Sequence, residues 1–164
     1  MRTFLRKTVL FALTLVPLGA AAQYYDLGQS PASIRWKQIR TPWNRFIFPE
    51  SYQGQALRLM KYLDTIRPVI GHGFRYGPMR MPVVMHTQNF ASNGLVMWAP
   101  KRMELIVPPN IETCAEPWLK QLATHEYRHS VQFNNTNRHF IKALSYVVGQ
   151  QGSLVGAALL PLWL

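Results

Sequence analysis

The stretch His125-Glu126-Tyr127-Arg128-His129 decides how this chain is interpreted, because it carries two histidines four residues apart. Residues at that spacing share one face of an α-helix, where both imidazoles can reach a single metal ion. A zinc ion held in this way lowers the pKa of its bound water to about 7. Glu126 can take a proton from that water without binding the ion. The motif therefore predicts a zinc peptidase helix, with His125 and His129 as metal ligands and Glu126 as general base.

Helix signals surround this motif. Thr113-Cys114-Ala115-Glu116 resembles a capping box and Pro117 suits a first helical turn, so we expect the helix to begin within residues 113–117. Apolar residues then recur near the helical period; they are Trp118, Leu119, Leu122, Ala123, Val131 and Phe133. The polar run at 134–137 is expected to end the helix. The sequence predicts one helix that directs both histidines into a cleft beside a sheet.

The third zinc ligand is not evident in the sequence. A catalytic zinc ion normally has three protein ligands and one open position. A metzincin would place its third histidine at the position of Asn135, so that family is excluded. In thermolysin-like enzymes the ligand is a glutamate on a later helix, yet no Asp or Glu lies between Tyr127 and Leu164. His139 and His86 are alternatives, although a lone histidine is more often a packed or solvated residue.

Several stretches outside the motif carry a family resemblance. They read WKQIRTP at 36–42, FIFP at 46–49, MPVVMH at 81–86, NGLVMWAP at 93–100 and WLKQLATHEYRH at 118–129. Together they resemble the start of an envelope-associated family from Bacteroidetes, zincin-type (gluzincin-like) metallopeptidases whose longer members are often labelled TolB-like. The resemblance covers most of residues 34–164.

This resemblance has implications for the metal site. In such relatives the chain continues past a Pro-Leu-Trp-like segment into a Trp-Phe-x-Glu-Gly-type motif, whose glutamate would be the third ligand. Here the sequence ends at residues 161–164, PLWL, so the resemblance implies an N-terminal fragment whose third ligand lies beyond Leu164. His125, Glu126 and His129 match the motif of the family. We expect the fragment to bind zinc weakly and to be inactive, with the downstream domains of the full-length protein as partners.

The N-terminal residues predict export. Basic residues open the chain, an apolar run covers 8–18, and small residues fill 19–22. This order is typical of a secretory signal peptide, and we expect cleavage after Ala22, with an uncleaved anchor as the alternative. The apolar run is too short for a comfortable membrane span. The expected location is the periplasm, the cell envelope or the extracellular space.

Charge and cysteine content restrict the partners. The net charge of +11 falls to +8 when residues 1–22 are removed. From Arg35 to Lys142 the basic residues are scattered, with only Lys101 and Arg102 adjacent, and no nucleic-acid motif accompanies them. We therefore expect no nucleic-acid partner, whereas a cationic surface favours association with an anionic envelope or membrane. Cys114 is the only cysteine, so no internal disulfide forms, and a small buried hydrophobe is the expected role.

Residues 23–164 suffice for one domain, which we expect to be a partial zincin-like domain of the α+β class. Residues 23–50 are rich in Pro, Gln and aromatic residues and predict an extended segment. Its Trp36, Trp43 and Phe46 are expected to pack onto the body of the domain.

The middle of the chain predicts a helix followed by strands. Apolar spacing indicates a helix over 51–70, stopped by the Gly-His-Gly run at 71–73. The expected strands cover 83–86, 95–98 and 103–107. A helix, a short mixed sheet, the motif helix and C-terminal helices follow one another in the order usual for zincin domains.

Two segments leave alternatives open. Residues 92–100 are expected to form the outer strand that borders the cleft and pairs with an extended substrate, with an ordinary core strand as the alternative. Residues 140–164 are strongly apolar. Gly149, Gly152 and Pro161 interrupt them, which favours buried helices over a membrane helix.

Two functions from different classes remain. The first is an exported zinc-dependent hydrolase that cleaves peptide or protein substrates with Zn²⁺ on His125 and His129. The second is a non-catalytic scaffold or binding module of the cell envelope that retains the motif helix as a structural element.

Overall fold

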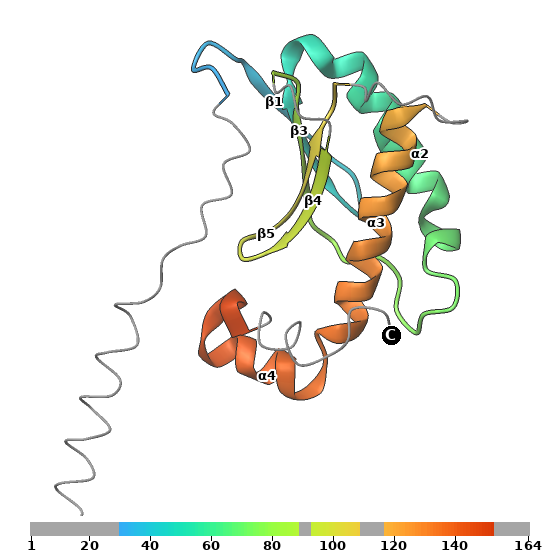
Figure 1. Ribbon diagram of the computed structural model, residues 1–164, viewed down its shortest axis with the longest axis vertical. Coiled ribbons are helices and arrows are strands. Elements are labelled where there is room, and N and C mark those ends of the chain that lie inside the picture. Colours follow the sequence, from blue (N-terminus) through green and yellow to red (C-terminus); the bar gives the residue numbers. More distant parts are fainter. Residues whose placement is uncertain (1–29, 89–92, 109–116, 153–164) are drawn as a thin grey trace, which may run out of the picture.

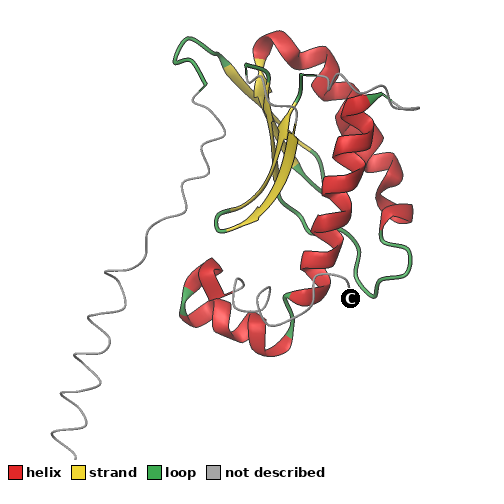
Figure 2. Ribbon diagram, in the orientation of Figure 1, coloured by secondary structure: helices red, strands yellow, loops and turns green. Residues whose placement is uncertain are grey.

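The computed structural model describes residues 30–88, 93–108 and 117–152. Its elements are β1 (Trp36–Arg40), β2 (Arg45–Pro49), η2 (Glu50–Tyr52), α2 (Gln53–Ile70), β3 (Pro82–His86), β4 (Asn93–Trp98), β5 (Lys101–Ile106), α3 (Trp118–Thr136), α4 (His139–Val147) and η3 (Gly149–Gln151). Helices α2 and α3 lie on one face of the sheet, and α4 follows beyond the end of α3 (Figures 1 and 2). The predicted α+β class is confirmed.

The sheet is mixed, with the strand order β1-β2-β3-β5-β4. The central strand β3 runs parallel to both β2 and β5, whereas the outer pairs β1–β2 and β4–β5 are antiparallel. Strand β4 is an edge strand, and α3 packs against it. The prediction of an outer strand next to the motif helix is therefore confirmed for residues 93–98, and its pairing with a substrate stays a prediction.

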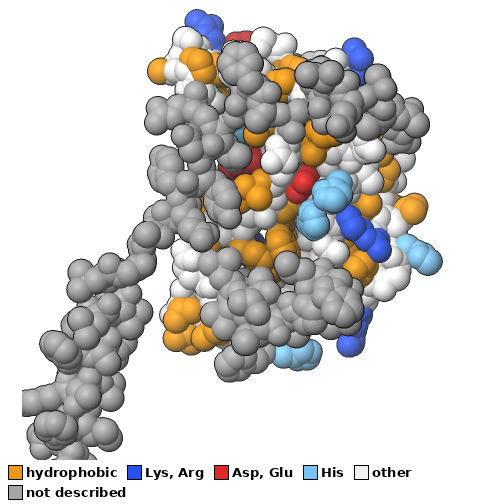
Figure 3. Space-filling view, viewed as in Figure 1, with side chains coloured by type: hydrophobic (Ala, Val, Ile, Leu, Met, Phe, Trp, Pro, Cys, Tyr) orange, Lys and Arg blue, Asp and Glu red, His pale blue; other side chains and the backbone are white. Residues whose placement is uncertain are grey.

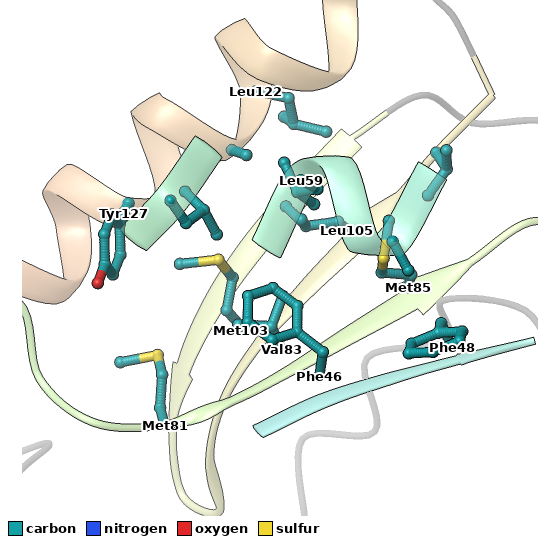
Figure 4. Packing of buried hydrophobic residues seen from close by; sticks show 14 of the residues in the cluster. Phe46, Phe48, Leu59, Met81, Val83, Met85, Met103, Leu105, Leu122 and Tyr127 are labelled. Carbon is teal, nitrogen blue, oxygen red and sulfur yellow. The ribbon is translucent and has the colours of Figure 1, made fainter. Parts of the chain in front are cut away.

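The hydrophobic core lies between the sheet and helices α2 and α3. Alternate strand residues point towards the helices because successive side chains in a strand face opposite sides. The core residues with the lowest exposure in the strands are Phe46, Phe48, Val83, Met85, Met103 and Leu105, each at 0%. Figure 4 shows these side chains on the helix-facing side of the sheet, together with Leu59 of α2 and Leu122 and Tyr127 of α3.

The expected helix over 51–70 and the three expected strands are all present. Helix α2 begins at Gln53, after a short 3₁₀ turn, and ends at Ile70. The following turn contains Gly73 with a φ of +84°, which L-residues with a Cβ rarely adopt. Strands β3, β4 and β5 fall within two residues of their expected bounds.

The expectation for residues 23–50 was incomplete. Strands β1 and β2 form an antiparallel hairpin there, in which Trp36 is opposite Pro49. Phe46 is fully buried, as expected, but Trp36 and Trp43 are 40% and 44% exposed. Trp36 lies in the edge strand β1 and Trp43 in the hairpin turn, so neither reaches the core. The expected signal peptide over 1–22 lies outside the described residues.

The motif helix begins later than expected. Helix α3 starts at Trp118, and Pro117 is its N-cap with a non-helical ψ of 126°. Pro117 is therefore not in the first turn, and the proposed capping box at 113–116, including Cys114, lies outside the described residues. The expected C-terminal end is confirmed, because the helix stops at Thr136.

The C-terminal apolar segment is less buried than expected over its described part. In α4, Ile141 is 9% exposed and therefore packs inwards, but Tyr146 and Val147 are 79% and 82% exposed. Apolar composition alone does not determine which sides of a helix are covered. Within residues 30–88, 93–108 and 117–152, no helix is long and apolar enough to cross a membrane. Residues 153–164 of the expected helical segment lie outside the described part.

Two residues of α2 provide a matched test of the core. Leu63 is fully buried, whereas Val69 on the same helix is 71% exposed. We expect Leu63→Ala to lower the free energy of unfolding by about 2 to 5 kcal/mol, because the lost side chain leaves a cavity. Val69→Ala should change it by less than about 0.5 kcal/mol. Urea unfolding of both variants measures the difference, and equal losses would contradict this packing of α2.

Candidate metal centre

His125 and His129 converge on one side of α3. Their Nε2 atoms are 3.1 Å apart and their ring centroids 4.7 Å apart. Two nitrogen ligands of a tetrahedral zinc ion, each at 2.0 to 2.1 Å, would be separated by about 3.3 Å. The two imidazoles therefore already have nearly the spacing that a shared ion requires. The prediction that one helix carries both histidines on one face is confirmed, whereas their expected position in a cleft and their role as ligands stay predictions.

A neighbouring side chain orients His129. Its Nδ1 lies 2.7 Å from Oε1 of Gln132, one turn further along α3. The amide oxygen can only accept, so this contact suits the tautomer with its proton on Nδ1, which leaves the Nε2 lone pair for a metal. Gln132 thus selects the tautomer that a ligand would need.

Glu126 is buried between α3 and the edge strand. Its exposed fraction is 5%, and an added Cβ on Gly94 of β4 would lie only 2.6 Å from its Cγ. Burial raises the pKa of the Glu126 carboxyl above its ordinary value, an effect that His129 and His125 partly oppose. Figure 3 shows histidine side chains beside an acidic one near the centre of one face. The carboxylate is therefore held next to the histidine pair by close contact with β4.

The two remaining motif residues attach α3 to α2. Tyr127 is fully buried, and its hydroxyl accepts a hydrogen bond of 2.8 Å from the guanidinium of Arg67. Arg128 donates to the carbonyl of Ile70, the last residue of α2, and to that of His72 in the following turn. These contacts fix the rotation of α3, and with it the direction of the histidines.

The far end of α3 is fixed by the loop after α2. Asn135 donates to the carbonyl of Tyr76 at 2.7 Å and accepts from its backbone N–H at 3.0 Å. Asn134 donates to the carbonyl of Gly77 at 2.8 Å, and Arg138 stacks on the Tyr76 ring at 3.6 Å. The helix is thus held at both its motif and its C-terminal turn.

No third ligand joins the histidine pair in the described ranges, where no group of three or more His, Cys, Asp or Glu side chains could hold a metal. His139, one of the expected alternatives, is an exposed residue at the start of α4. His86 is also excluded as the third ligand of this site. Its neighbour Met85 points into the core beneath the helices, so His86 points to the opposite face of the sheet.

His86 instead belongs to an ionic cluster on that opposite face. Its Nε2 lies 3.5 Å from Oε2 of Glu104, and Arg102 donates to the other carboxylate oxygen. Although burial alone would raise it, the pKa of Glu104 is lowered by the neighbouring imidazole of His86 and by the hydrogen bond and charge of Arg102. The Trp36 ring lies edge-on to His86, with the ring centroids 6.0 Å apart. This packing gives His86 a structural role.

No protein-family model, curated protein or solved structure matches this chain.

Three residues that shape the site were not expected from the sequence. They are Gly94, Gln132 and Arg67, which contact Glu126, His129 and Tyr127 respectively. Only Gly94 had a usable signal, because a glycine inside a strand often marks a close approach of two segments.

The contact between Gly94 and Glu126 can be tested by a double-mutant cycle. We expect Gly94→Ala to lower the free energy of unfolding by about 1 to 3 kcal/mol, because the new methyl group collides with the Glu126 side chain. In a Glu126→Ala background the same change should cost less than about 0.5 kcal/mol.

The control is Gly54→Ala in α2, where an added Cβ meets nothing within 4 Å. This variant should not be destabilised. Additive effects of Gly94→Ala and Glu126→Ala in urea unfolding would show that the strand and the carboxylate do not touch.

Proposed function

We propose that this chain carries the metal-binding helix of an exported, gluzincin-like zinc peptidase that hydrolyses peptide bonds. The observation that supports this most directly is the pair of Nε2 atoms 3.1 Å apart with the buried Glu126 beside them on α3. An α+β domain with its edge strand next to this helix is compatible with the proposal. Location in the periplasm or cell envelope is part of the same proposal, based on the N-terminal residues.

The donor set suits zinc in type, although it supplies two of the usual three protein ligands. Nε2 of His125 and Nε2 of His129 would hold the ion, and the third ligand is proposed to be a glutamate beyond Leu164. A bound zinc ion would supply Lewis acidity and lower the pKa of a coordinated water. The carboxylate of Glu126 would accept the proton of that water and later deliver it to the leaving amine.

Strand β4 is suited to align an extended peptide. Among the described strands it pairs only with β5, so the backbone groups on its other side are available. An extended substrate could pair with this side through main-chain hydrogen bonds. Because Gly94 of β4 contacts Glu126, such a peptide would pass close to the general base.

Two substitutions separate metal binding from proton transfer in the full-length protein. We expect Glu126→Gln to lower peptide hydrolysis by about 10²- to 10⁴-fold while zinc stays near stoichiometric, because an amide cannot act as a base. His129→Ala should lose both zinc and activity, because it removes a ligand. Peptidase assays and metal analysis of the purified proteins measure both effects.

A control for the charge change is Glu50→Gln, since Glu50 is half exposed and pairs only with Lys37 in the described structure. This variant should keep full activity. Retained activity in Glu126→Gln together with its loss in His129→Ala would contradict the assignment of the base but leave the metal site intact. Absence of stoichiometric zinc from the full-length wild-type protein would instead favour the non-catalytic envelope scaffold.

The number of ligands predicts the zinc affinity of residues 23–164. We expect weak binding, because the histidine pair gives two ligands and the proposed third lies outside this sequence. Extension of the chain through the expected glutamate should strengthen binding markedly. Isothermal titration with zinc compares the two proteins. Tight one-to-one binding by residues 23–164 would mean that another residue of this chain completes the site.

A further inference from the structure

A cavity lies at the hairpin turn between β1 and β2, and neither His125 nor His129 lines it. Its volume is about 300 Å³, and its walls are Arg40, Thr41, Trp43, Asn44, Arg45, Arg80, Met81 and Pro82. Three of these eight residues are arginines and none is acidic. The cavity lining is thus cationic, because the β1–β2 hairpin brings Arg40 and Arg45 together and the segment before β3 adds Arg80.

Two of the arginines, Arg40 and Arg45, lie close enough to repel each other. Arg40 and Arg45 are direct cross-strand partners at the end of the hairpin, and like charges in that position repel each other. Within the described ranges neither side chain has an ion-pair partner. Arg80 donates to the carbonyl of Pro42 and so connects the segment before β3 to the hairpin turn. A bound anion would remove the repulsion between Arg40 and Arg45.

Asn44 connects the cavity lining to helix α3. It is 5% exposed, and its Oδ1 has no hydrogen-bond partner although the atom is buried. Its amide nitrogen donates to the hydroxyl of Tyr127 at 3.4 Å. Asn44 is thus held by Tyr127, and the three guanidinium groups of the cavity lining suit an anionic ligand.

We propose that this cavity binds a phosphate group, either as free phosphate or as a phosphomonoester. Arginine is suited to phosphate because its planar guanidinium can donate two parallel hydrogen bonds to adjacent oxygens. A phosphomonoester carries a charge of about −1.5 to −2 at pH 7, because its second pKa is about 6. Arg40, Arg45 and Arg80 would bind the charged oxygens of the phosphate. Zinc is not required.

The test is calorimetric titration of the purified chain at constant ionic strength with three probes. They are inorganic phosphate, glucose 6-phosphate, and vesicles in which phosphatidic acid is mixed into phosphatidylcholine. Each of Arg40→Gln, Arg45→Gln and Arg80→Gln should weaken binding about tenfold, the effect of losing one charge-assisted hydrogen bond. Arg58→Gln is the matched control, because Arg58 is an exposed arginine of α2 outside the cavity.

The titrations distinguish a specific phosphate site from nonspecific attraction between charges. Binding that weakens in the three cavity variants but stays within about twofold in Arg58→Gln supports the site, and the tightest probe identifies the source of the phosphate. Equal weakening in Arg58→Gln would show nonspecific charge attraction and overturn the proposal. So would the lack of saturable binding to all three probes.

Thermal unfolding gives a second, independent measurement. Without phosphate, Arg45→Gln should raise the melting temperature, because it removes the repulsion with Arg40. Added phosphate should stabilise the wild type more than this variant, because only the folded wild type binds the ligand tightly. Equal stabilisation of both proteins by phosphate would contradict the site even if the variant folds normally.

Discussion

The attachment of α3 through Tyr127 determines the geometry of the candidate metal centre. Its side chain is fully buried, and its hydroxyl accepts hydrogen bonds from Arg67 and Asn44. An α-helix is stiff, so fixing one residue fixes the direction of its neighbours. With Tyr127 directed towards α2 and the hairpin turn, Glu126 contacts Gly94 of β4 and the two histidines remain together.

Tyr127 also lies between the two proposed binding sites. Asn44, which lines the arginine cavity, donates to the same hydroxyl as Arg67, whose guanidinium is 4.3 Å from the Trp43 ring. The proposed phosphate site and the histidine pair are thus connected through one buried side chain. A difference in Tyr127 position between the phosphate-bound and free protein would be needed for one site to affect the other.

The sequence was sufficient for elements with a regular apolar pattern and insufficient for contacts between elements. Helix α2 and strands β3, β4 and β5 were predicted because their buried residues recur at regular spacing. Hairpin β1–β2 was missed, because all but one residue of β1 is exposed and no apolar alternation marks it. The contact of Gly94 with Glu126 and the convergence of three arginines depend on the tertiary arrangement, which a single sequence does not specify.

The strand order also has a consequence for folding kinetics. The hairpins β1–β2 and β4–β5 join neighbouring segments, with only short loops to close. Strand β3 instead pairs in parallel with β2 across the whole of α2, and with β5 across β4. Such nonlocal pairings cost more loop entropy and slow the folding reaction. The two hairpins can therefore form early and independently, and the insertion of β3 between them becomes the slow event that completes the sheet.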